Sequence, residues 1–171
     1  GDSFSDSAMR MDSWLWQALH SQGSKYKNVH FYGDDTWTNL CPFLGRQSGG
    51  KVEGYQSFHL FDLHTVDGAV KHAMFPVLES RRFDMLIAHF LGHDHCGHKH
   101  GPSHEECGLK LAEMDGVIRK TVELLDDDDV LVVMGDHGMT DEGDHGGVSA
   151  KEVSSVLFAY SRGHRLPAIS E

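Results

Sequence analysis

Apolar residues recur along the first half of the chain with spacings that predict a helix, a strand and a second helix. Residues 12–22 place apolar side chains at helical spacing, which predicts an amphipathic helix. The β-prone run 29–32 predicts a short strand that ends at a Gly-Asp-Asp turn. The Gly- and Ser-rich stretch 44–54 predicts a loop. Residues 66–78 predict a helix that is interrupted near Pro76.

The second half of the chain alternates more regularly between predicted strands and predicted helices. Residues 84–91 predict a buried strand, and residues 105–125 carry apolar side chains near the 3.6-residue period of a helix. The aliphatic run 130–134 is typical of a strand buried on both faces, and residues 153–160 predict a further strand. This order predicts an α/β fold with a mainly parallel sheet flanked by helices. In such sheets the functional residues lie beyond the carboxyl ends of the strands.

Composition narrows the class of protein. The 171 residues carry a formal net charge of −11, which argues against a nucleic-acid partner, because such a surface needs a basic stripe. Three cysteines (Cys41, Cys96 and Cys107) without CxxC spacing exclude a dense disulfide scaffold and a Cys-based zinc site, although one pair could form in an oxidising compartment. No apolar run approaches the roughly 20 residues of a transmembrane helix. The chain starts at Gly1 without a signal peptide, and we expect it to be a fragment of a longer protein.

Fourteen histidines are the most informative feature of the composition, and five of them lie between residues 93 and 104. The string GHDHCGHKHGP follows the predicted strand 84–91 directly. Asp94 and His98 are four residues apart, so a helical turn would place them on one face, where they could bind one ion. The alternative is a solvated His-rich loop that binds metal only adventitiously.

A second cluster follows the aliphatic strand 130–134, in the string GDHGMTDEGDHGG at residues 135–147. Asp136 comes directly after that strand, where a buried ionised carboxylate is costly unless it is paired or metal-bound. A glycine before Asp136 lets it converge with His137, and His145 lies on a glycine-flanked loop that can approach them. The alternative is an Asp-His turn that only caps the backbone.

These motifs resemble a known family. The pattern D-x-x-G-H at 94–98, D-H-G-M at 136–139 and a later histidine is similar to that of the alkaline phosphatase superfamily. Within it, the strings FYGDDTW (31–37), HFLGHDHCGHKHGP (89–102) and GDHGMTDEGDHGG (135–147) resemble the GPI ethanolamine phosphate transferases, in particular type 3. The likeness extends from about residue 4 to residue 160. It implies that residues 1–171 form part of an alkaline-phosphatase-like phosphotransferase domain that is incomplete at its N-terminus.

The resemblance also implies a ligand set for two divalent metal ions, expected to be zinc. Asp136 and His137 would bind one ion, whereas Asp94, His98 and His145 would bind the other. The first ion would take further ligands from upstream, an Asp and the nucleophilic Thr, and neither can be assigned in this chain. We therefore expect no catalytic nucleophile here and no activity from the isolated chain.

Some nearby residues fit the family pattern less well. Ser3, Ser5 and Ser7 do not match the context of the family's nucleophile and are expected to form a polar loop or helix lead-in. His93 stands where we expect an apolar residue.

The implied reaction moves phosphoethanolamine from phosphatidylethanolamine to a mannose of the GPI-anchor precursor, in GPI-anchor biosynthesis. By the same resemblance the domain faces the lumen of the endoplasmic reticulum, is attached to the membrane through parts outside this chain, and has a small membrane subunit as a candidate partner. A phosphodiesterase or phosphatase of the same superfamily, and a non-catalytic metal-binding remnant, are the alternatives.

Other polar residues have two interpretations each. Asp34 and Asp35 could face the cleft or form a turn, and Asp62, His64 and Asp67 could support the site or cap the helix that follows. His95 and His100 could approach a substrate phosphate, or could be solvated loop residues. The run 126–129 is expected to be a solvated turn, because consecutive carboxylates lack the alternating spacing of a calcium loop.

Overall fold

The computed structural model describes residues 19, 24–41, 44, 49–57, 59 and 62–166. The chain divides into two compact units, residues 1–92 and residues 93–171. The predicted helix 12–22 and the three N-terminal serines lie outside the described residues, apart from Leu19, which is helical and buried.

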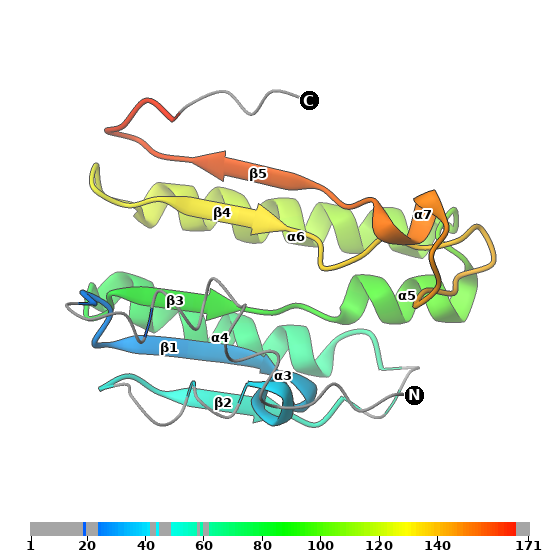
Figure 1. Cartoon of the computed structure of the whole chain (residues 1–171), viewed down its shortest axis with the longest axis horizontal. Helices are drawn as coiled ribbons and strands as arrows, with labels where there is room; N and C mark the ends of the chain where they lie inside the picture. The colour runs from blue at the N-terminus through cyan, green and yellow to red at the C-terminus, as the bar shows by residue number, and fades with distance from the viewer. Residues whose placement is uncertain are drawn as a thin grey trace. The chain divides into compact units, whose positions relative to one another are not determined.

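A three-stranded parallel sheet forms the first unit, with the strand order β2-β1-β3 (Figure 1). The central strand β1 is Val29–Asp34, and its neighbours are β2 (Val52–Tyr55) and β3 (Met85–Ala88). Phe31 pairs with Val52 on one side and with Ile87 on the other. The expected α/β class with a mainly parallel sheet is confirmed.

Among the described residues, the helices α3 and α4 accompany this sheet, and buried apolar side chains hold the unit together. Helix α3 (Asp35–Leu40) follows β1 directly, and α4 (Thr65–Ser80) contacts both β1 and β3. The buried core is formed by Leu19, Val29, Phe31, Cys41 and Leu44, with Trp37, Val52, Met85 and Ile87 packed against it.

Two predictions in this unit are wrong in detail. The stretch 44–54 is not all loop, because its last residues belong to β2, which pairs in parallel with the central strand β1. Helix α4 is not interrupted at Pro76 but continues to Ser80. Proline removes one backbone hydrogen bond, and the buried apolar face of α4, with Val70, Met74 and Leu78, stabilises the helix in spite of that loss.

The second unit contains a long helix, a two-stranded ladder and two short helices. Helix α5 is Gly92–His100, α6 is Glu105–Leu124, and α7 is Ala150–Val153. Strands β4 (Leu131–Met134) and β5 (Leu157–Tyr160) pair in antiparallel orientation. The predicted helix 105–125 is confirmed almost to the residue.

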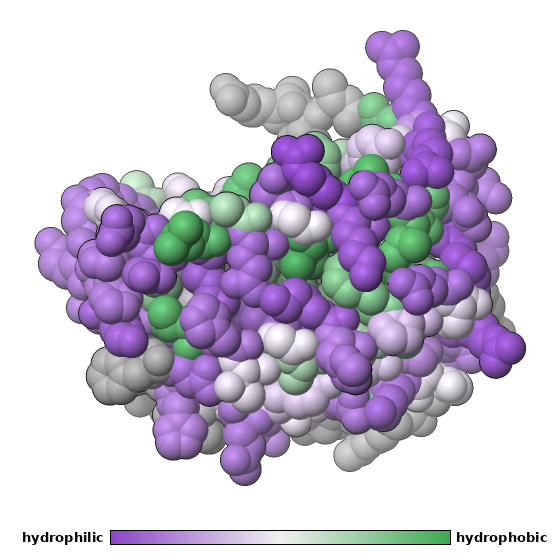
Figure 2. Space-filling model, turned by 180° about the vertical axis from the view of Figure 1, so that it is seen from behind, coloured by the Kyte–Doolittle hydropathy of each residue, from purple (hydrophilic) through white to green (hydrophobic). Residues whose placement is uncertain are grey.

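Two strand predictions here need correction. Strand β4 is not buried on both faces: within the described residues it pairs only with β5, and Val132 and Met134 are about half exposed, at 48% and 53%. The segment 153–160 is strand only from Leu157, because its first residue ends α7. Hydrophilic side chains cover most of the surface in the view of Figure 2, with apolar side chains exposed in separate groups. No described helix is long and apolar enough to span a bilayer.

Candidate metal centre

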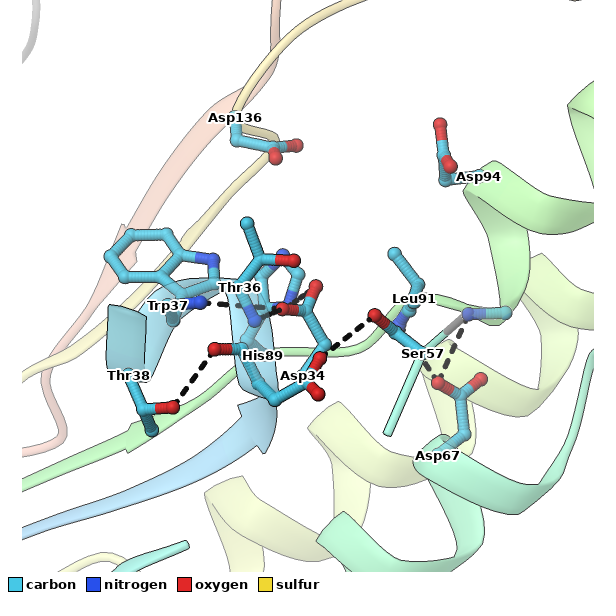
Figure 3. Close-up of polar contacts among 12 residues, drawn as sticks. Asp34, Thr36, Trp37, Thr38, Ser57, Asp67, His89, Leu91, Asp94 and Asp136 are labelled. Atoms are coloured by element: carbon cyan, nitrogen blue, oxygen red, sulfur yellow. Dashed lines mark hydrogen bonds and ion pairs between the residues drawn. The ribbon is translucent and has the colours of Figure 1, made fainter. Parts of the chain in front are cut away.

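Polar side chains in the first unit organise the carboxyl ends of β1 and β3 (Figure 3). Asp34, the buried last residue of β1, caps α3 by accepting hydrogen bonds from the backbone N–H groups of Thr36 (2.6 Å) and Trp37 (3.3 Å). Its other oxygen lies 3.6 Å from Nδ1 of His89, which follows β3, and the His89 ring packs against Trp37. Asp34 therefore caps a helix rather than forming a turn, and Asp35 is the first residue of that helix.

Asp67 plays a similar part where the chain leaves β3. It lies in the first turn of α4 and is 1% exposed. One of its carboxylate oxygens accepts hydrogen bonds from the backbone N–H groups of Leu91 (2.9 Å) and Gly92 (3.0 Å), as Figure 3 shows. These N–H groups stand at the start of α5, where no helical carbonyl is available to them. Asp67 thus fixes the first residue of the helix that carries the histidine cluster.

Asp94 and His98 lie on one face of α5, as their spacing predicts. Nε2 of His98 is 3.4 Å from Oδ2 of Asp94, in an i,i+4 arrangement. Both side chains are about one-quarter exposed, so they are partly shielded and still reachable from solvent.

The turn after β4 orients His137. Its Nδ1 lies 2.8 Å from the carbonyl oxygen of Gly138, and a carbonyl can only accept, so Nδ1 carries the proton. The lone pair of the neutral ring is then on Nε2, which lies 3.7 Å from Oδ2 of Asp136. Gly138 also donates from its N–H to the carbonyl oxygen of Glu152 (2.7 Å), which ties this turn to α7.

Gly143 brings the loop that carries His145 against α5. It adopts φ +88°, and a Cβ at this position would lie well inside the contact distance of the Gly97 carbonyl oxygen, 3.1 Å from its carbon and 3.5 Å from Cα of His98. The turn is closed by hydrogen bonds from Gly143 N–H to the carbonyl oxygen of Thr140 (3.1 Å) and from Thr140 N–H to that of Asp144 (2.9 Å). Only a glycine allows both the conformation and the close approach.

Three imidazole rings therefore converge on one carboxylate. Nε2 of His145 lies 3.3 Å from Oδ1 of Asp94, and Nε2 of His137 lies 3.9 Å from the same oxygen. The rings of His137 and His145 stack with centroids 3.8 Å apart, and the rings of His98 and His145 are 4.8 Å apart. Ligand atoms of Asp94, His137 and His145 all lie within 4.8 Å of one another.

This donor set fits a divalent cation. Oδ1 of Asp94 is buried and accepts no hydrogen bond from any described residue, which is costly for an ionised carboxylate without a bound cation. Four-coordinate zinc with bonds of about 2.0–2.1 Å separates its donors by about 3.3–3.5 Å, close to the spacing of Asp94 from His145. Imidazole nitrogen and carboxylate oxygen are ligands that zinc accepts together.

The geometry brings Asp94, His98, His137 and His145 together, and Asp136, whose side chain is 56% exposed, joins this cluster through His137 at 3.7 Å. The two predicted sets, Asp136 with His137 and Asp94 with His98 and His145, are not separated, because His137 also approaches Asp94. Their roles as metal ligands, and the division between two ions, stay predictions.

The other candidates lie outside this cluster. His95 and His100 belong to α5, and the expectation of a solvated loop is wrong for His95, which is 4% exposed, whereas His100 is exposed and stacks on His104. His93 is exposed. Burial raises the pKa of Cys96 to about 12, followed in importance by its hydrogen bond with Cys107, so this thiol is a poor ligand at neutral pH.

Two further expectations concern turns and caps. Asp62 accepts hydrogen bonds from the backbone N–H groups of His64 (3.0 Å) and Thr65 (2.9 Å), which confirms the capping interpretation. Residues 126–129 form an exposed turn closed from Asp129 to Asp126, as predicted.

Glu152 is a residue that the sequence reasoning missed. Its carboxylate accepts hydrogen bonds from Gly147 N–H (2.7 Å), Ser149 N–H (3.2 Å) and Ser149 Oγ (2.5 Å), in a capping box that starts α7. The S-x-x-E signal at 149–152 was visible in the sequence. These bonds hold the segment that directly follows His145.

An α/β fold with a histidine and aspartate cluster after its strands agrees with one family of phosphoryl-transfer proteins. Residues 5–156 match the model of the type I phosphodiesterase / nucleotide pyrophosphatase family, and the chain belongs to that family.

Among curated proteins, the chain is 47% identical over 169 residues to the catalytic subunit of GPI ethanolamine phosphate transferase 3 from Mus musculus, covering 99% of this chain and 15% of that protein. It is 48% identical over 161 residues to the same subunit from Homo sapiens, covering 94% and 14%. It is also 42% identical over 167 residues to GPI ethanolamine phosphate transferase 2 from Candida glabrata, covering 94% and 20%. The chain thus spans about one-seventh to one-fifth of the length of these relatives, and the suspected resemblance is confirmed.

Proposed function

We propose that this chain supplies metal ligands to a phosphoethanolamine transferase of GPI-anchor biosynthesis. Its relatives are named for that activity, and the chain covers only a small part of their length. The observation that supports the proposal most strongly is the convergence of His98, His137 and His145 on the carboxylate of Asp94.

The proposed ligands are the five residues of this cluster, with two divalent ions, zinc by the nature of the donors. When bound, such ions neutralise charge on a phosphoryl group and support the attacking and leaving oxygens. The described residues hold the carboxylate and imidazole groups in position: the Gly138 carbonyl fixes the ring of His137, and Gly143 brings His145 to α5. The nucleophilic threonine is expected from another part of the protein.

The proposed substrates are phosphatidylethanolamine as donor and a mannose of the GPI glycolipid as acceptor. The proposed location is the lumenal side of the endoplasmic reticulum membrane, with attachment through other parts of the protein and with a small membrane subunit as partner. Family likeness supports these assignments.

The test uses the protein in membranes that contain the GPI precursor. Asp94→Asn and His145→Gln should each lower transfer of labelled phosphoethanolamine at least about 100-fold and lower the bound zinc. His164→Gln is the matched control, because this exposed histidine pairs with Asp128, outside the cluster, and its loss should leave both quantities unchanged. Full transfer activity in both cluster variants would contradict the proposal.

A phosphodiesterase that releases its product to water is the second candidate, and the description of the matching family supports it. Both functions would use the same ligands, so the acceptor distinguishes them. Hydrolysis of a chromogenic phosphodiester without transfer to the glycolipid, lost in Asp94→Asn, would favour the phosphodiesterase. Transfer to the glycolipid with little hydrolysis would favour the transferase.

A further inference from the structure

Met139 ends the string DHGM, and the proposed set of ligands gives it no role. It follows His137 by two residues, and its side chain is partly buried. Gly97 has a corresponding place in the other motif, because it directly precedes His98 in α5 and is buried. Both residues belong to the second unit of the chain. They therefore lie next to ligands on two different segments of the metal centre.

The thioether of Met139 occupies the space that a side chain at position 97 would fill. A Cβ on Gly97 would lie 2.9 Å from Cε of Met139 and closer still to its Sδ. Atoms in a packed interior do not approach one another that closely, so the methionine reaches the backbone of α5 only because position 97 is a glycine. Methionine suits such a contact, since its unbranched, polarisable side chain fills irregular gaps.

The residues after Met139 continue along the same face of α5. Gly97 and Gly101 are four residues apart, and a Cβ on Gly101 would lie 3.8 Å from the carbonyl oxygen of Asp141. Gly143 packs on the carbonyl group of Gly97, as described above. The segment 139–143, which connects the turn of His137 to the loop of His145, is thus in contact with α5 at several points.

The residue before Met139 is held by a different helix. A Cβ on Gly138 would lie 3.1 Å from the carbonyl carbon of Lys151 and closer to the carbonyl oxygens of Lys151 and Ser154. Gly138 is therefore fixed against the backbone of α7, and Met139 is fixed against the backbone of α5. Together the two contacts determine where the turn that carries His137 lies.

We propose that Met139 is a positioning residue for the metal centre, whose contact with Gly97 sets the distance between His137 and the ligands on α5. Nε2 of His137 lies 3.9 Å from Oδ1 of Asp94, and a zinc ion bound by both would lie about 2.0–2.1 Å from each. A relative shift of about 1 Å between the two segments is enough to impair such a site. The inference rests on the proposed function, and the effect of Met139 on the ions passes through His137 and α5.

A double-mutant cycle in the full-length protein tests the contact through zinc affinity, measured by competition with a chelator. Gly97→Ala fills the space of the thioether and Met139→Ala removes the thioether, so each should weaken zinc binding about tenfold. The double variant should bind zinc no more weakly than either single variant, because the same contact is lost in all three. Met139→Leu keeps a similar volume and should stay within about threefold of the unmodified protein. A loss of about 100-fold in the double variant, the product of two independent effects, would overturn the proposal.

Gly116→Ala and Met134→Ala are the matched controls. Gly116 lies in α6, where a Cβ would meet no described residue within 4 Å, and Met134 is 53% exposed in β4. Both variants should bind zinc as the unmodified protein does. The visible absorption of the cobalt-substituted protein gives a second measurement, because it reports the geometry around the metal. The spectrum should change in Met139→Ala and stay the same in both controls, and an unchanged spectrum in Met139→Ala would contradict its positioning role.

Hydrogen exchange in the protein stripped of metal separates this inference from the proposed function. The backbone N–H groups of Thr140 and Gly143 close the turn that follows Met139. They should exchange about tenfold faster in Gly97→Ala and in Met139→Ala than in the unmodified protein, because the turn opens more often without its contact to α5. Equal exchange in all three proteins would overturn the contact itself. An unmodified protein that binds no zinc would refute the proposed function, whereas normal zinc affinity in Met139→Ala would refute only the role of Met139.

Discussion

Gly143 offers the sharpest perturbation of the proposed metal site, because it has no side chain that could bind the metal and acts only through the backbone of its loop. An alanine at this position must adopt φ near +88°, which costs about 1–2 kcal/mol for an L-residue. Its Cβ would also press on the backbone of Gly97 and His98, which cannot rotate away, and overpacking of this kind costs about 1–3 kcal/mol. We therefore expect Gly143→Ala to destabilise the protein by about 2–5 kcal/mol.

The same clash has a consequence for metal affinity. Relieving it requires the loop to move away from α5 by about 1 Å, which separates His145 from Asp94. A displacement of this size should weaken metal binding about 10–100-fold, the usual effect of disturbing the support of a ligand.

Gly146→Ala is the matched control for backbone strain. Gly146 has φ +98°, and a Cβ there would meet nothing within 4 Å, so the variant bears the conformational cost without the clash. Competition with a zinc chelator measures affinity, and urea unfolding measures stability. If the two variants bind zinc equally well, the contact between Gly143 and α5 does not position His145, and the reasoning fails.

Two further predictions concern other parts of the chain. Glu152→Ala removes the hydrogen bonds that hold the segment after His145, and we expect it to weaken zinc binding about tenfold. Glu152→Gln keeps the capping box and should bind zinc almost normally. Competition with a zinc chelator measures the affinity of both variants. Hydrogen bonds, above all from the Thr65 side chain, lower the pKa of Asp62 to about 2 from its ordinary 3.8, so its contribution to stability is complete above about pH 4 and is lost as pH falls toward 2. Urea midpoints of the unmodified protein and Asp62→Ala should therefore differ at pH 7 and converge near pH 2.

Local patterns predicted much of the fold because they rest on short-range physics. The 3.6-residue period of α6 and the β-branched and aromatic content of β1 depend only on neighbouring residues, and both elements appear where expected. Strand β2 was missed because it is short, contains a glycine and follows Gly49-Gly50, so its local sequence is a weak strand former. Its pairing with β1 comes from a contact about 20 residues away in the chain. The predicted interruption at Pro76 was wrong for a related reason, because the packing of α4 on the sheet outweighs the local cost of a proline in a helix.

The candidate site was also predictable only where it depends on neighbouring residues. The four-residue spacing of Asp94 and His98 requires only a helical turn, and the structure supplies it. The approach of His137 and His145 to the carboxylate of Asp94 depends on the conformation of two loops, which no periodic pattern in the sequence predicts. Gly143 and Gly138, which allow the loops to pack, look like ordinary turn glycines until the groups around them are known.

X-ray absorption at the zinc edge of the purified protein tests the central claim most directly. Ligation by Asp94, His98, Asp136, His137 and His145 predicts nitrogen and oxygen neighbours at about 2.0–2.1 Å, with the outer-shell scattering of imidazole rings that weakens in His145→Gln. A sulfur shell at about 2.3 Å, or a protein that binds no metal at all, would contradict it.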